Sequence, residues 1–183
     1  HGGGIAGRTE ATGRGIEEVI REFFRNKEEV KKAKLNENLK DNRIVIQGFG
    51  NVGRHLAYEL YNRDNAKIIA IGEYNGILYN EKGIDINKLI ECVLFKKTIE
   101  NNELGKFIKN PKEIVEVDCD ILVPAALEGV INKDNVEKVK TKLIVEAANG
   151  PIDPASDKIL FNKGVTVLPV SYTHLRAHET SID

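Results

Sequence analysis

The feature that most constrains the fold is the hexapeptide Gly48-Phe49-Gly50-Asn51-Val52-Gly53. It follows the apolar run of residues 44–46 and precedes residues 55–63, whose apolar spacing favours a helix. Three glycines at this spacing, between a strand and a helix, are typical of a phosphate-binding turn. The first permits the tight turn, the second lets a pyrophosphate approach the backbone, and the third lets helix and strand pack closely.

An acidic residue follows at the distance that such a site requires. A second apolar run, residues 67–71, ends at Gly72-Glu73, and Glu73 lies twenty residues after Gly53. A carboxylate at the end of this strand accepts hydrogen bonds from the adenosine ribose of a dinucleotide. The sequence therefore predicts a dinucleotide site. The alternative is a glycine turn in another kind of βαβ unit, with an unrelated acid downstream.

The wider pattern predicts an α/β fold of the Rossmann-like, doubly wound type, with a mostly parallel sheet and flanking helices. Five short apolar runs alternate with helical segments, and we expect strands at 43–47, 67–71, 119–123, 142–146 and 165–168. Helices are expected over 16–34, from the end of the hexapeptide loop to about residue 62, and over 84–97, 132–140 and 153–162, with a loop or short hairpin over 74–83. Residues 100–112 are polar and give no clear pattern.

Ligands of such a sheet bind outside the carboxyl ends of its strands. Gly48, Glu73, Ala125 and Asn149 each follow or end a predicted strand. We therefore expect the fold to bring these four residues to one edge of the sheet.

Composition limits the possible partners. The chain has 183 residues, 27 of them basic and 28 acidic, which gives no basic surface field for nucleic acid or for an anionic membrane. Its apolar runs are far shorter than the roughly twenty residues that span a bilayer, and no leader-like segment opens the chain. We therefore expect no nucleic-acid or membrane partner and a cytoplasmic location.

The sequence predicts no metal site. Cys92 and Cys119 lack metal-ligand spacing and are expected to be reduced, structural thiols. The only spaced histidine pair, His174 and His178, lies in residues 170–183, which break the alternating pattern and are interpreted as a non-native or disordered tail.

Four motifs together resemble one family. They are Gly7-Arg8-Thr9-Glu10-Ala11-Thr12-Gly13-Arg14-Gly15, the hexapeptide 48–53, Pro124-Ala125-Ala126 and Ala147-Ala148-Asn149-Gly150-Pro151. In residue identity, order and spacing they resemble the C-terminal cofactor-binding domain of the glutamate, leucine, phenylalanine and valine dehydrogenases, over residues 2–169. The hexapeptide and the last motif are most similar to those of the glutamate enzymes.

The resemblance implies reversible oxidative deamination of L-glutamate to 2-oxoglutarate and ammonia, with a nicotinamide cofactor. The implied cofactor-binding residues are Thr12, Gly48, Phe49, Gly50, Asn51, Val52, Gly53, Glu73, Ala125, Ala126 and Asn149. Arg8 and Asn149 are implied to contact the amino acid substrate. We expect NAD as the cofactor, because Glu73 would repel a 2′-phosphate and no arginine follows it directly; NADP is not excluded.

These roles have structural alternatives. Thr12 could cap the following helix, Arg8 could pair with Glu10 at the surface, Asn149 and Glu73 could be turn residues, and Ala125-Ala126 could be small for packing alone.

The domain organisation follows from the same resemblance. Residues 1–169 are expected to form an incomplete dinucleotide-binding domain, because the family's catalytic lysine and aspartate belong to a substrate domain that precedes it. We therefore expect no catalytic residue in this chain, an inactive fragment on its own, and a homo-oligomer when full length. A leucine, phenylalanine or valine dehydrogenase, and a stand-alone dinucleotide-sensing module, remain the alternatives.

Overall fold

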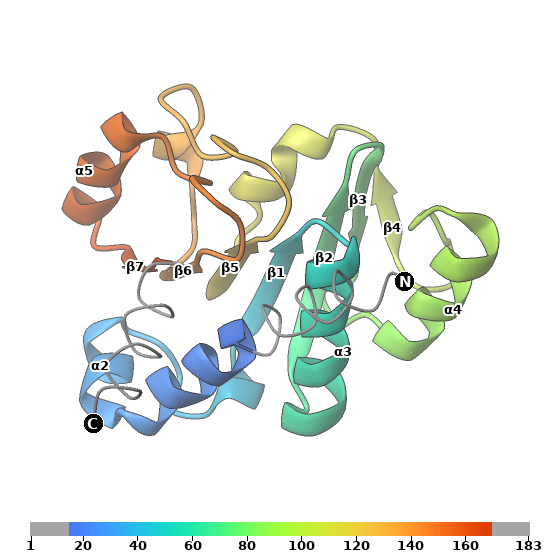
Figure 1. Cartoon of the computed structure of the whole chain (residues 1–183), viewed down its shortest axis with the longest axis horizontal. Helices are drawn as coiled ribbons and strands as arrows, with labels where there is room; N and C mark the ends of the chain where they lie inside the picture. Colours follow the sequence, from blue (N-terminus) through green and yellow to red (C-terminus); the bar gives the residue numbers. More distant parts are fainter. Residues whose placement is uncertain (1–14, 170–183) are drawn as a thin grey trace, which may run out of the picture.

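A seven-stranded sheet in the order β4-β3-β2-β1-β5-β6-β7 forms the centre of the molecule (Figure 1). The computed structural model describes residues 15–169. The strands are β1 (Arg43–Gln47), β2 (Lys67–Glu73), β3 (Gly76–Tyr79), β4 (Lys106–Ile108), β5 (Ile121–Pro124), β6 (Leu143–Val145) and β7 (Thr166–Leu168). The five strands from β2 to β7 through β1 pair in parallel, which confirms the predicted α/β fold and its mostly parallel sheet.

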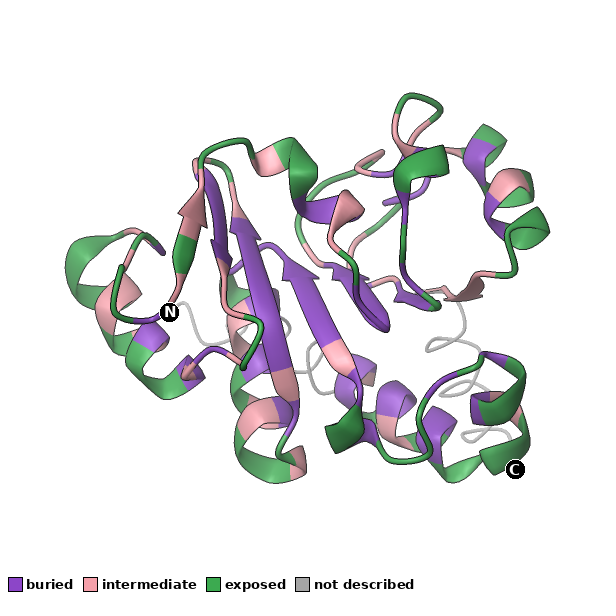
Figure 2. Cartoon of the chain, turned by 180° about the vertical axis from the view of Figure 1, so that it is seen from behind, coloured by how far each residue is buried: buried purple, intermediate pink, exposed green. Residues whose placement is uncertain are grey.

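Helical segments cover both faces of this sheet. They are a helix over 15–25, α2 (Lys27–Lys32), η1 (Leu39–Asp41), α3 (Asn51–Asp64), α4 (Ile86–Lys96), η2 (Pro111–Glu116), η3 (Val136–Lys138) and α5 (Pro154–Asn162). Ile44 and Ile46 pack on one face with the helix over 15–25, α3 and α4, whereas Val45 packs on the other with η2, η3 and α5. Successive side chains of a strand point to opposite faces, and the middle residues of the central strands are accordingly apolar and buried on both faces (Figure 2). The arrangement is doubly wound, as predicted.

Two predicted helices differ in the structure. The expected helix over 16–34 is broken at Asn26, whose side chain accepts a hydrogen bond from the Glu29 N–H and so begins α2 as a separate helix. The expected helix over 132–140 is only turns and the short η3. There Asn135 accepts from the Asn132 N–H and donates to the Val130 carbonyl, and such side-chain bonds compete with helical ones.

An antiparallel edge completes the sheet. The segment 74–83, expected to be a loop or short hairpin, contains β3, which forms a hairpin with β2, and β4 then pairs with β3. Gly76 permits this close pairing, because a Cβ there would lie 2.5 Å from the Ile108 carbonyl oxygen. β4 was not predicted, because it has only three residues and lies within the mostly polar segment 100–112.

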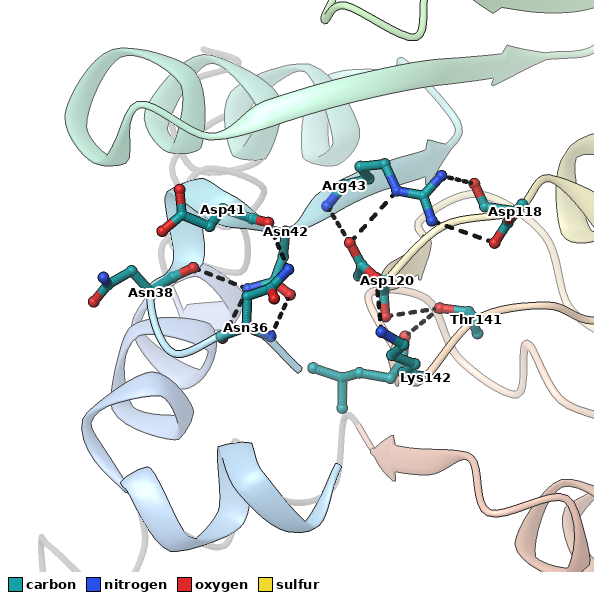
Figure 3. Close-up of polar contacts among 10 residues, drawn as sticks. Asn36, Asn38, Asp41, Asn42, Arg43, Asp118, Asp120, Thr141 and Lys142 are labelled. Atoms are coloured by element: carbon teal, nitrogen blue, oxygen red, sulfur yellow. Dashed lines mark hydrogen bonds and ion pairs between the residues drawn. The ribbon is translucent and has the colours of Figure 1, made fainter. Parts of the chain in front are cut away.

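Buried polar groups tie the loops together at the amino ends of the strands (Figure 3). Asn42 is fully buried, and its side-chain amide donates to the carbonyls of Asn36 and Asn38 while its oxygen accepts from the Asn36 N–H. These bonds fix the loop that leads into β1.

Asp120 links three strands at the same end (Figure 3). Its buried carboxylate accepts a 2.7 Å hydrogen bond from the Arg43 N–H of β1 and lies 3.3 Å from the Lys142 Nζ, just before β6. The Thr141 hydroxyl donates to the Asp120 carbonyl. The amino ends of β1, β5 and β6 are thus held together by hydrogen bonds and ion pairs within the chain.

Replacing Asp120 by alanine is expected to lower the free energy of unfolding by about 2 to 3 kcal/mol, because a buried charged hydrogen-bond acceptor is lost. Asp118 also pairs with Arg43 but is 72% exposed, so Asp118→Ala is the matched control and should cost about 0 to 1 kcal/mol. Urea unfolding of both variants measures the difference. Equal destabilisation by the two substitutions would refute the role given to Asp120.

Candidate functional site

The candidate site lies where β1 and β5 end side by side. Gln47 of β1 and Pro124 of β5 are register partners at the carboxyl ends of these strands. From this point the chain leaves β1 into α3 on one face and leaves β5 towards η3 on the opposite face. Such a reversal of winding direction is the place where doubly wound sheets bind ligands.

Gly48 makes the turn that follows β1. Its φ of +105° is a conformation that other residues rarely adopt, and a Cβ there would lie 2.6 Å from the Cβ of Ala126. Its N–H donates to the Gly72 carbonyl at 2.7 Å. The first glycine therefore permits both the turn and the contact with the loop after β5.

Gly53 brings α3 against this turn. A Cβ at Gly53 would lie 2.0 Å from the Gly48 carbonyl oxygen, which is far inside any tolerable contact. The third glycine therefore serves the close packing of helix and loop that the sequence predicted.

Gly50 differs from its two neighbours because it has space around it. A Cβ at Gly50 would meet no atom of residues 15–169 within 4 Å. Gly50 is the N-cap of the 14-residue α3 but has no capping side chain, and the first turn of this helix contains no acidic residue. Backbone N–H groups at such a helix start attract anions, so the open space fits a phosphate group.

The other three residues of the hexapeptide support the loop. Phe49 is buried, and Val52 is half-buried against the same core cluster. Asn51 is exposed at the first position of α3, where its side-chain oxygen accepts from the Arg54 guanidinium at 3.1 Å.

Glu73 is placed beside the hexapeptide, at the end of β2. Its carboxylate accepts a hydrogen bond from the Phe49 N–H through Oε1. The carboxylate also lines a cavity of about 230 Å³, together with Phe49, Arg54, Tyr74, Asn75, Val93, Leu94, Lys97, Thr98 and Ile99. Glu73 thus lines an open cavity next to the phosphate-type turn.

Two cationic side chains that line this cavity were not predicted from the sequence. No arginine follows Glu73, but Arg54 comes from the first turn of α3 and Lys97 from the end of α4. The position of Arg54 directly after Gly53 was visible in the sequence. Lys97 could be placed only by the packing of α4 against α3.

The two alanines and Asn149 belong to the loops after the neighbouring strands. The Ala125 N–H donates to the Gln47 carbonyl at 2.7 Å, and the Ala126 N–H lies 3.3 Å from the Gln47 side-chain oxygen. Asn149 is exposed in the loop after β6, which the Ala147 N–H ties to the Pro124 carbonyl. The structure thus brings the hexapeptide, Glu73 and the alanines together, and it holds the Asn149 loop at the same edge.

The remaining predicted site residues, Arg8 and Thr12, lie outside the described residues, as do His174 and His178. Both cysteines are free. Burial raises the pKa of the Cys119 thiol to about 12, which leaves it protonated and unreactive at neutral pH, in agreement with a structural role.

A second cluster of chemically active side chains was not predicted. Glu17, His55 and Glu59 bring their potential ligand atoms within 4.8 Å of one another, between the helix over 15–25 and α3. Only the spacing of His55 and Glu59, one helical turn apart, was visible in the sequence.

Comparison with known proteins identifies the family. The family model for Glutamate/Leucine/Phenylalanine/Valine dehydrogenase matches residues 3–173. The chain belongs to this dehydrogenase family. Family membership confirms the resemblance that the four sequence motifs indicated.

Individual members of the dehydrogenase family match nearly the whole chain. A mitochondrial glutamate dehydrogenase of Dictyostelium discoideum is 45% identical over 91% of the chain and 33% of its own length. An NADP-specific glutamate dehydrogenase of Saccharolobus shibatae is 41% identical over 91% of the chain and 37% of its own length. The chain therefore spans about a third of the length of these relatives.

A solved structure agrees with the fold. The hetero-hexameric glutamate dehydrogenase of Thermus thermophilus, in its leucine-bound form, superposes with a TM-score of 0.76 at 25% identity. The match covers 90% of the chain and 36% of that structure. Among residues 15–169, no helix combines the length and the apolar character needed to cross a bilayer.

Proposed function

We propose that this chain is the dinucleotide-binding part of an amino acid dehydrogenase that acts on L-glutamate, with residues 1–169 as the binding domain. One observation carries the proposal. A Cβ atom would clash at Gly48 and at Gly53, whereas Gly50 is the one glycine of the hexapeptide with free space beside it. This is the division of tasks that a pyrophosphate-binding turn requires. The names of the relatives from Dictyostelium discoideum and Saccharolobus shibatae support glutamate as the substrate.

Each of the proposed site residues then contacts a different part of the dinucleotide. The N–H groups at the start of α3 hold the pyrophosphate beside Gly50, and Glu73 accepts from the adenosine ribose. Ala125 and Ala126 line the adenosine side, and Asn149 lies near the nicotinamide ribose and the substrate. Arg8 and Thr12 complete the site towards the substrate and the carboxamide, as the family resemblance implies.

The contribution of this chain to the reaction is binding and orientation. When bound, the nicotinamide ring accepts or delivers the hydride at the α-carbon of the amino acid. The buried turn at Gly48 and the packing of Gly53 fix the loop before a ligand arrives, so little conformational entropy is lost on binding. We assign no catalytic residue to this chain.

We further propose that NAD is preferred over NADP. Glu73 is an anion beside the place of the ribose 2′ position, although Arg54 and Lys97 line the same cavity and reduce its repulsion of a phosphate. The name of the Saccharolobus relative shows that NADP-specific members of the family exist. The proposal therefore depends on the charge of Glu73 rather than on the family.

The Glu73→Gln variant is expected to move the ratio of NADH to NADPH affinity by about tenfold in favour of NADPH, since the charge repulsion of about 1 kcal/mol or more is removed. Glutamine keeps the size of the side chain and an oxygen that accepts from the Phe49 N–H. Parallel fluorescence titrations with NADH and NADPH measure the ratio. Glu81→Gln, which removes an exposed acid in the β3–α4 turn, is the matched control. An unchanged ratio in Glu73→Gln would contradict the proposed NAD preference.

The activity itself needs a separate test. Protein expressed from the full reading frame that contains this chain should oxidise L-glutamate in preference to leucine, phenylalanine or valine, with nicotinamide reduction as the readout. Preference for an apolar amino acid would favour a different member of the family. Cofactor binding without any oxidation would favour a dinucleotide-sensing module.

The assembly and the location of the protein are proposals as well. We propose a homo-oligomer for the full-length protein; the Thermus thermophilus structure is described as hetero-hexameric. A cytoplasmic location remains a prediction from composition, and the Dictyostelium discoideum relative is named as mitochondrial.

A further inference from the structure

Three side chains with metal-ligating atoms meet where the helix over 15–25 packs on α3. Glu17 comes from the first of these helices, and His55 and Glu59 lie one turn apart on α3, so that they face the same side. One ligand atom from each side chain lies within 4.8 Å of the others. The cluster is separate from the hexapeptide and from the cavity at Glu73.

Two of these side chains have buried polar atoms without a hydrogen bond. Glu17 is only 2% exposed, and within residues 15–169 its Oε2 has no hydrogen-bond partner. The same is true of the His55 Nε2, which lies 3.9 Å from the Glu59 Oε1. This separation is too long for a hydrogen bond. Buried polar atoms without partners are rare in native proteins, and a bound water or ion is a common explanation.

The surrounding charges leave an excess of negative charge. Arg21 pairs with one oxygen of Glu17 and also with Glu18 and Asp64. The single positive charge of Arg21 is therefore shared by three carboxylates.

The second guanidinium nearby does not change this balance. Arg63 lies 3.6 Å from Glu59, and its side chain is largely exposed. Burial raises the pKa of Glu17. Arg21 lowers it, but the Glu59 and Asp64 carboxylates raise it further. A further cation between Glu17 and Glu59 would offset both the burial and the repulsion.

From this geometry we propose that Glu17, His55 and Glu59 bind a divalent transition-metal ion, with Zn²⁺ as the best match. One imidazole and two carboxylates suit Zn²⁺, whereas Mg²⁺ prefers oxygen ligands alone. Tetrahedral bonds of about 2.1 Å place two ligand atoms about 3.4 Å apart, so side-chain movements of roughly 1 to 1.5 Å complete the site. Arg21 then holds the second oxygen of Glu17 and orients that ligand.

The ion would fasten the helix over 15–25 to α3. This helix follows the motif that contains Arg8 and Thr12, and α3 begins at the phosphate-type turn. A metal at Glu17, His55 and Glu59 therefore stabilises the relative position of two segments that carry proposed site residues. Its role is structural.

The test is thermal unfolding and equilibrium dialysis of the complete chain with ZnCl₂, and with MgCl₂ in parallel. The expected result is one tightly bound Zn²⁺ per chain and a higher melting temperature with Zn²⁺, because binding to the folded state alone stabilises it. Mg²⁺ at the same concentration should produce neither effect.

Variants distinguish this site from the His174/His178 pair. His55→Asn and Glu59→Gln should each lose the Zn²⁺-dependent rise in melting temperature and bind Zn²⁺ at least about tenfold more weakly, as expected for loss of a ligand. His174→Asn/His178→Asn and Glu18→Gln are the controls and should behave as the unmodified chain. No bound Zn²⁺ in the unmodified chain, undiminished binding in His55→Asn, or loss in the His174/His178 control would each overturn the proposal. If His55→Asn does not fold, Glu59→Gln alone decides.

Discussion

Replacing Gly53 by alanine is expected to lower the free energy of unfolding by about 3 kcal/mol, at the upper end of the usual cost of overpacking. The new Cβ would lie 2.0 Å from the Gly48 carbonyl oxygen, and both atoms belong to the backbone or are fixed by it. Alanine otherwise favours a helix over glycine by about 1 kcal/mol. A loss of stability in Gly53→Ala would therefore show that the contact with the Gly48 carbonyl oxygen outweighs the helix preference of alanine. Urea unfolding measures this change in the free energy of unfolding.

Gly50→Ala is the matched control for this experiment. Gly50 has an ordinary backbone conformation, with φ −78° and ψ −159°, and open space beside it, so the same substitution should leave stability nearly unchanged. If Gly53→Ala proves as stable as Gly50→Ala, then α3 does not pack on the turn as described.

Replacing Gly50 by valine is expected to weaken NADH binding by about a hundredfold, which is about 2.7 kcal/mol, while the fold is retained. The valine side chain would occupy the open space in which the pyrophosphate is proposed to approach the start of α3. The chain contains no tryptophan, so the fluorescence of NADH itself is the suitable signal for the titration. Thermal unfolding of the same sample shows that the variant is folded.

Gly50→Ala again provides the comparison, because its single methyl group fills only part of this space. Its NADH affinity should fall between those of the unmodified chain and Gly50→Val. Equal NADH affinity in all three folded proteins would mean that the dinucleotide does not lie against Gly50.

The parts of the fold that could be predicted are those whose sequence pattern is local. β1, β2, β5 and β6 contain continuous apolar runs that are buried on both faces, and the hexapeptide marks the turn between β1 and α3. By contrast, β4 is a three-residue strand that exists because Gly76 lets Ile108 approach β3, which is a contact across 32 residues of sequence. The break at Asn26 depends on one side-chain hydrogen bond within an otherwise helical pattern.

The candidate site shows the same division. Gly48, Glu73, Ala125 and Asn149 were predicted because strand ends can be located in the sequence and parallel strands place these ends at one edge. The cations Arg54 and Lys97 were missed because helix packing, not spacing, brings them to Glu73. The absence of a metal site was likewise predicted from local spacing.

The cluster of Glu17, His55 and Glu59 instead joins two helices through the fold. A search of the sequence for closely spaced ligands finds only the pair on α3. The third ligand, Glu17, becomes visible only when the helix over 15–25 is packed on α3.

Binding at this edge of the sheet is tested most directly by mapping NADH on the complete chain through the chemical shifts of its backbone amides. Saturable changes are expected, largest at Gly50, Asn51, Val52, Gly53, Glu73, Ala125 and Ala126. A larger hollow of about 670 Å³, lined by residues of α5 and β7 that include Asp157, Phe161 and Val167, should be unaffected. Changes centred on that hollow, or no change in a folded chain, would contradict the central claim that the dinucleotide binds where β1 and β5 end.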